Sequence, residues 1–134
     1  MAGPTEHMST KLFVYGTLMR GEERDGLVAH LSAVPATVRG HLWRAPAGYP
    51  ALMLDPSGPK IQGELLKLNQ ESILMVLDLY EGVAEGLYTR EIIDVNVNGQ
   101  NESAWAYTMS RTQLRMAGCQ PTKAIDWRML SPKR

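Results

Sequence analysis

A short apolar segment that ends at a glycine is the first place in the sequence where chemistry could occur. Leu12 to Tyr15 form a nearly continuous apolar run, typical of a strand buried on both faces, and Gly16 ends it. The next backbone N–H groups then lack ladder partners, and where a helix follows they converge on a volume suited to a carboxylate or an oxyanion. An ordinary strand-to-helix turn with a packed tyrosine is the commoner explanation. The pattern alone leaves both interpretations open.

A carboxylate at the end of an apolar helix is the second place. Large apolar residues recur at helical spacing within residues 70–80: Ile73, Leu74, Leu77 and Tyr80. Gly82 is expected to end this helix, which puts Glu81 at the C-terminus, where the helix macrodipole disfavours negative charge. This placement and apolar neighbours both raise the pKa of a carboxyl group, as a general base requires. A solvated surface acid is the commoner alternative, and Asp78, one turn earlier, is a second candidate carboxylate.

Other catalytic chemistries lack the residues that they need. The single cysteine, Cys119, excludes an internal disulfide and a cysteine-rich zinc site, and we interpret it as a buried or incidental thiol. The three histidines have no metal-binding spacing, and the glycines match neither a phosphate loop nor a dinucleotide fingerprint. The sequence therefore predicts a site that uses no metal and no cofactor.

Composition limits the class of protein. A chain of 134 residues buries about two thirds of its surface on folding, which is enough for one core. Lys+Arg and Asp+Glu number 14 each, so the chain lacks the basic surplus on which nucleic-acid and membrane-surface binding rely. It has no apolar run of membrane-spanning length, and its N-terminus is too polar for a signal peptide. We therefore expect a soluble cytoplasmic protein, a monomer by default, with a small-molecule partner.

Periodicity and turn residues predict the elements that must position these groups. After the strand at 12–15, further strands are expected in five segments: 34–45, 51–54, 61–68, 87–97 and 102–109. Gly40 marks a bend inside its strand, and Asn98-Gly99 marks a hairpin turn. Besides the helix at 70–80, a short helix is expected after the sequence GEERDG.

This order of elements favours the α+β class, as a small mixed β-barrel with flanking helices. Residues 1–10 are expected to form a disordered lead-in, and residues 11–110 the folded domain. Residues 111–134 carry a basic surplus and are expected to form a partly irregular tail that packs on the domain or trails it.

Several segments, taken in order, resemble the gamma-glutamylcyclotransferase-like family. They are FVYGTLMRG with LVAHL, VRGHL, GYPAL, IQGELL, LDLYEGV with LYTREIIDV, and AWAYT. The resemblance runs from about Lys11 to Met109, and the paired signatures are specific where YGTL alone would be weak. The tail segment AIDWRML also resembles the Gly-Asp-Trp-Arg ending of many microbial members, with Ile125 where glycine is usual.

The resemblance implies a compact barrel, flanked by helices, with a central pocket. Family members release 5-oxoproline from a gamma-glutamyl group and free the attached amine, as transferase or lyase-type enzymes without a cofactor. The loop that holds the gamma-glutamyl group corresponds to Tyr15, Gly16, Thr17 and Leu18. The family's general base corresponds to Glu81, and further pocket tyrosines correspond to Tyr88 and Tyr107.

The function of this chain is therefore predicted to be gamma-glutamyl cyclotransfer with Glu81 as the base. One alternative is the same ring closure on a specialised biosynthetic gamma-glutamyl donor, and another is a non-catalytic small-molecule binding module on the same barrel. The loops at 45–49 and 85–87 are expected to shape the end of the pocket that receives the leaving amine. A bound substrate carboxylate and a developing oxyanion both stay possible as ligands of the loop after Gly16.

Overall fold

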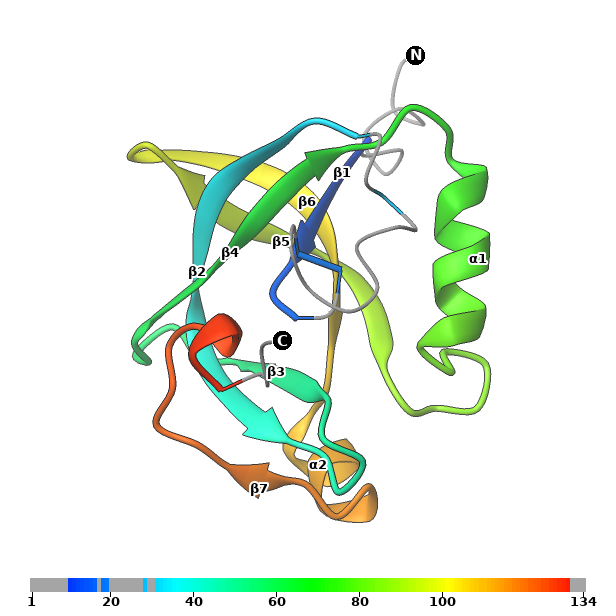
Figure 1. Ribbon diagram of the computed structural model, residues 1–134, viewed down its shortest axis with the longest axis vertical. Coiled ribbons are helices and arrows are strands. Elements are labelled where there is room, and N and C mark those ends of the chain that lie inside the picture. The colour runs from blue at the N-terminus through cyan, green and yellow to red at the C-terminus, as the bar shows by residue number, and fades with distance from the viewer. Residues whose placement is uncertain (1–9, 17, 20–27, 29–30, 131–134) are drawn as a thin grey trace.

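Five strands with alternating buried side chains curl into a closed barrel (Figure 1). The computed structural model of the protein describes residues 10–16, 18–19, 28 and 31–130. The barrel strands are β1 (Lys11–Val14), β2 (Ala33–Arg44), β4 (Lys60–Lys67), β5 (Thr89–Val97) and β6 (Gln100–Thr108). They follow the order β2-β4-β1-β6-β5, and a pairing of Thr37 with Asn96 joins β5 back to β2. Only the β1–β6 pairing among them is parallel, so the predicted α+β class and mixed barrel are confirmed.

The long strand β2 changes partner at its central glycine. Residues 33–39 pair with β4, whereas residues 40–44 pair with β3 (Pro50–Leu54). A Cβ atom on Gly40 would come within 2.5 Å of the carbonyl oxygen of Met53, so only glycine allows β3 to approach this closely. The strand-interior glycine therefore marks the point where β2 passes from pairing with β4 in the barrel to pairing with β3 (Figure 1).

The predicted hairpin and helix end are both present. β5 and β6 pair along their whole length around Asn98 and Gly99, whose φ angles of 52° and 85° fit a tight hairpin turn. Helix α1 (Ser72–Tyr80) lies beside the barrel and buries Leu74 and Leu77 (Figure 1). It ends at Gly82, where φ is 63°, a backbone conformation that glycine adopts without strain.

The helix expected after GEERDG lies outside the described residues. A helix that was not predicted, α2 (Arg111–Met116), follows β6. A capping box begins it: the Ser110 hydroxyl accepts the Gln113 N–H, and the Gln113 side chain accepts the Ser110 N–H. The Ser-x-x-Gln spacing is a sequence signal for this helix.

The segment after α2 runs back across the barrel and is fixed there by three kinds of contact. It contains β7 (Gln120–Pro121), which pairs with β2, and the 3-10 helix η3 (Trp127–Met129). The N–H of Gln62 on β4 donates to the carbonyl of Ile125 at 2.7 Å. Trp127 is 2% exposed, and the Arg44 guanidinium lies 5.9 Å from its ring centroid.

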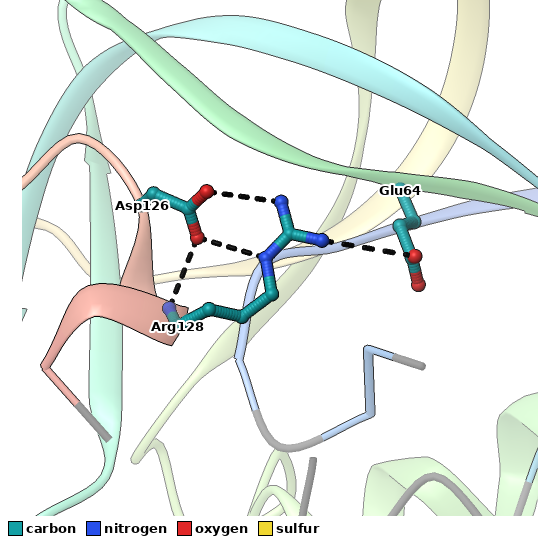
Figure 2. Close-up of polar contacts among 3 residues, drawn as sticks. All are labelled: Glu64, Asp126 and Arg128. Atoms are coloured by element: carbon teal, nitrogen blue, oxygen red, sulfur yellow. Dashed lines mark hydrogen bonds and ion pairs between the residues drawn. The ribbon is translucent and has the colours of Figure 1, made fainter. Parts of the chain in front are cut away.

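Arg128 adds a charged link between this segment and the barrel (Figure 2). Its guanidinium donates two hydrogen bonds to the Asp126 carboxylate, at 2.9 and 3.0 Å, and reaches Glu64 of β4 at 3.9 Å. The backbone N–H of Arg128 also donates to Asp126, which caps η3. The guanidinium therefore lies between a carboxylate of its own segment and one of the barrel.

The burial of Trp127 predicts how strongly this segment contributes to stability. Trp127→Ala should lower the free energy of unfolding by about 3–5 kcal/mol, because it leaves a large cavity over the barrel. Met129→Ala, in the same turn but 76% exposed in the parent, is the matched control and should change stability by less than about 0.5 kcal/mol. Urea unfolding measures both. Equal stability of the two variants would show that the segment does not depend on Trp127.

Candidate functional site

The hydroxyl of Tyr15, directly after β1, connects two other strands. It donates a hydrogen bond to the carbonyl oxygen of Tyr107 at 2.6 Å and accepts one from the N–H of Leu52 at 3.2 Å. Burial raises the pKa of the Tyr15 phenol far above its ordinary value, and the negative charge of Glu81 raises it further. The hydroxyl therefore keeps its proton and holds β3 against β6.

A second buried tyrosine holds the beginning of β3. The hydroxyl of Tyr88, which directly precedes β5, donates to the carbonyl oxygen of Pro50. Burial raises the pKa of Tyr88 as well, and the negative charge of Glu81 adds to the effect. This phenol is therefore also a neutral donor at physiological pH.

Gly16 lies against Pro50, the first residue of β3. A Cβ atom on Gly16 would overlap the ring of Pro50, so the absence of a side chain brings the loop after β1 against β3. The N–H of Met19 donates to the Gly16 carbonyl at 3.0 Å, which makes a turn, and Leu18 is buried. Thr17, which the sequence analysis also assigns to this loop, lies outside the described residues.

Asp78 on α1 is bound by two donors from the barrel. Its Oδ1 atom accepts a hydrogen bond from the Tyr107 hydroxyl at 2.7 Å and another from the Arg90 Nε at 2.8 Å. The Arg90 guanidinium also lies 4.3 Å from the ring centroid of Trp105. Burial raises the pKa of Tyr107, and the hydrogen bond to Asp78 raises it further. Asp78 thus ties α1 to β5 and β6, one turn before Glu81.

Glu81 is the C-cap residue of α1, as predicted. Its N–H donates to the Leu77 carbonyl at 2.9 Å, and the N–H of Val83 donates to the Asp78 carbonyl at 3.1 Å, so the turn that carries Glu81 is held by the helix. The side chain is partly buried, whereas that of Tyr80, one of the apolar neighbours, is 52% exposed and turned to solvent. Glu81 is therefore more enclosed than Tyr80.

Four tyrosines from different parts of the barrel lie within electrostatic range of this carboxylate. After burial, the negative charge of Glu81 contributes to a raised pKa at each of them: Tyr15, Tyr49, Tyr88 and Tyr107. They come from the end of β1, the β2–β3 turn, the residue before β5 and the end of β6. The structure thus brings Glu81 together with three tyrosines that the sequence analysis assigns to the site and with one that it does not.

Tyr49 ends the loop 45–49, which the sequence analysis assigns to the leaving-amine end of the pocket without singling out this residue. Its ring is partly buried, and its centroid lies 6.2 Å from that of Tyr88. Burial raises the pKa of Tyr49, and the negative charge of Glu81 raises it further. The signal in the sequence is the Gly-Tyr-Pro segment at the turn before β3, where Pro50 begins the strand that the two buried tyrosines hold.

Cys119 is buried in the segment between α2 and β7. Burial raises the pKa of this thiol, so it stays protonated and weakly nucleophilic at neutral pH. Among the described positions, no group of three or more His, Cys, Asp and Glu side chains is placed to hold a metal ion. In the same part of the chain, no helix is long and apolar enough to cross a membrane.

The chain matches one protein family over most of its length. The model of the family described as "Gamma-glutamyl cyclotransferase, AIG2-like" matches residues 12–129. The chain belongs to this family. No curated protein sequence matches the chain significantly.

Solved structures with the same fold come from bacteria and mammals. YkqA from Bacillus subtilis superposes with a TM-score of 0.70 at 23% identity, over 91% of this chain and 40% of YkqA. An AIG2-like protein from Mus musculus superposes with a TM-score of 0.61 at 26% identity, over 75% of this chain and 76% of that one. A structure described as gamma-glutamyl cyclotransferase gives a TM-score of 0.61 at 19% identity, over 81% and 80%. This chain therefore spans less than half of YkqA and most of the other two.

The close approach of Gly16 to Pro50 predicts a coupled effect on stability. Gly16→Ala should lower the free energy of unfolding by about 1–3 kcal/mol, because the added methyl group forces the Pro50 ring away from its site. In a Pro50→Ala background the ring is absent, so the cost of Gly16→Ala should be smaller by about 1 kcal/mol. Urea unfolding of the four proteins in this cycle measures the coupling. The same cost in both backgrounds would contradict the assigned contact.

Proposed function

We propose that this protein is a gamma-glutamyl cyclotransferase with Glu81 as its general base. The α-amine of a gamma-glutamyl substrate attacks the substrate's own γ-carbonyl carbon. A new C–N bond closes a five-membered ring, and the bond from the same carbon to the leaving amine breaks. The amine is protonated at neutral pH, so Glu81 first accepts a proton from it, and the leaving amine takes up a proton as it departs. The products are 5-oxoproline and a free amine or amino acid.

One observation carries this proposal: Glu81 is a partly buried carboxylate at the C-cap of α1, and its charge adds to the raised pKa of four tyrosines. These tyrosines come from the ends of β1 and β6, the β2–β3 turn and the residue before β5. A carboxylate placed in this way attracts an ammonium group and can take its proton. The family's general base corresponds to the same residue.

The second candidate carboxylate is less suited to this role. Oδ1 of Asp78 already accepts hydrogen bonds from the Tyr107 hydroxyl and from Arg90. This oxygen is therefore already used within the protein, by a charge-assisted contact to a guanidinium and by a phenol. We therefore assign Asp78 to fixing α1, and through it the turn that carries Glu81.

The loop after β1 is proposed to hold the gamma-glutamyl half of the substrate. The side chain of Leu18 is buried and that of Gly16 is absent, so this loop offers backbone groups to a ligand. The hydroxyls of Tyr15 and Tyr88 donate to the backbone carbonyls of Tyr107 and Pro50, and the hydroxyl of Tyr107 donates to Asp78. These three side chains are therefore suited to form the walls of the site. Folding an extended substrate into its ring-closing conformer can lower the barrier by about 7–11 kcal/mol in favourable cases.

Substitution of Glu81 tests the proposed base. Glu81→Gln keeps the size of the side chain but cannot accept the proton, so kcat should fall by about 10²–10⁴-fold, with a smaller change in KM. Activity of the parent protein should also fall on acidification, as the carboxylate becomes protonated. Release of 5-oxoproline from gamma-glutamyl substrates, followed by chromatography, measures both effects.

The matched control is Glu71→Gln, an exposed acid at the other end of α1 whose side chain makes no capping hydrogen bond. It should retain parental turnover. A folded Glu81→Gln variant with near-parental kcat would remove Glu81 from the mechanism. A parent protein that binds gamma-glutamyl compounds and releases no 5-oxoproline would instead identify a non-catalytic binding module.

A further inference from the structure

The tyrosines around Glu81 differ in what their hydroxyls do. Those of Tyr15, Tyr88 and Tyr107 are engaged in hydrogen bonds with the protein. For Tyr49, no hydrogen-bond partner is found among the described residues, and its ring is partly exposed. Tyr49 is therefore the tyrosine of the site whose side chain remains available to a ligand.

Tyr49 is also less buried than the other three tyrosines of the site. Tyr15, Tyr88 and Tyr107 are 6%, 4% and 4% exposed, whereas Tyr49 lies on the β2–β3 turn, between buried and exposed. It stays close enough to Glu81 for the carboxylate to raise its pKa, and its ring lies beside that of Tyr88. Tyr49 thus marks the rim of the site.

We propose that Tyr49 contacts the substituent of the leaving amine and selects substrates in which that substituent is flat and apolar. This inference rests on the proposed function. The gamma-glutamyl half is common to all substrates and becomes the ring, so it belongs beside Glu81 and the buried loop. The leaving half must extend from the same carbonyl carbon toward solvent, and it therefore passes the rim where Tyr49 lies.

The surroundings of Tyr49 favour an uncharged, flat substituent. On one side is the ring of Tyr88, tilted by 43° to that of Tyr49, and the thiol of Cys119 is neutral at physiological pH. Aromatic rings attract one another in offset and tilted arrangements, beyond the effect of the buried area. A substituent with its own ring can therefore gain a contact here that a short alkyl group cannot.

Two substrates with the same gamma-glutamyl half test this proposal: γ-L-glutamylbenzylamide and γ-L-glutamylethylamide. In Tyr49→Leu, kcat/KM should fall about tenfold more for the benzylamide than for the ethylamide, because the ring-to-ring contact is lost. Tyr49→Phe keeps the ring and should keep the parental ratio between the two substrates. Met116→Leu, which alters an 84% exposed side chain at the end of α2, is the control and should leave both values unchanged.

The outcomes separate this inference from the proposed function. An equal loss on both substrates in Tyr49→Leu would overturn the inference, since the ring would then not discriminate between leaving groups. A Tyr49→Phe variant that loses the preference as fully as Tyr49→Leu would overturn it too, by assigning the effect to the hydroxyl. A parent protein that cyclises neither amide would overturn the proposed function, and this inference with it. Thermal unfolding of each variant shows that it is folded.

Discussion

The hydroxyl of Tyr15 joins β3 to β6, and the arrangement of the site depends on this junction. β3 is not one of the barrel strands, because it pairs with the part of β2 that begins at Gly40. Near the site, β3 is held by the Tyr15 and Tyr88 hydroxyls and by the contact of Pro50 with Gly16. A buried N–H that lost its partner there would cost about 1–3 kcal/mol. Because Tyr49 directly precedes β3, the same junction sets the position of the rim.

The second support of the site comes from α1. The barrel holds this helix through Asp78, which is bound by Tyr107 and Arg90, and the turn that follows carries Glu81. Tyr107 belongs to both supports, since its carbonyl accepts from Tyr15 and its hydroxyl donates to Asp78. The loop after β1, the start of β3 and the turn that carries Glu81 are thereby linked through β6. This linkage suits a reaction in which the substrate supplies its own nucleophile and the protein supplies position and a base.

Local signals in the sequence predicted much of the fold, because each required feature involves neighbouring residues. Asn98-Gly99 has the backbone freedom of a tight turn, Gly82 ends α1, and Gly40 lies where β2 changes partner. The Ser110–Gln113 capping box is an equally local signal, and it marks the start of α2. Local signals could not predict which tyrosine hydroxyls form hydrogen bonds with the protein and which one stays available to a ligand. Whether a hydroxyl binds Asp78 or a ligand depends on residues 29 positions apart in the chain, as for Tyr107, or 38, as for Tyr88 and Pro50.

The most direct test of the account is the fate of solvent oxygen during turnover. γ-L-Glutamylethylamide is incubated with the protein in water enriched in oxygen-18, and the products are examined by mass spectrometry. Attack by the substrate's own amine predicts 5-oxoproline without the heavy isotope, together with ethylamine, and no glutamate. Glutamate that carries one atom of oxygen-18 would show that water attacks the γ-carbonyl, and it would contradict the proposed ring closure.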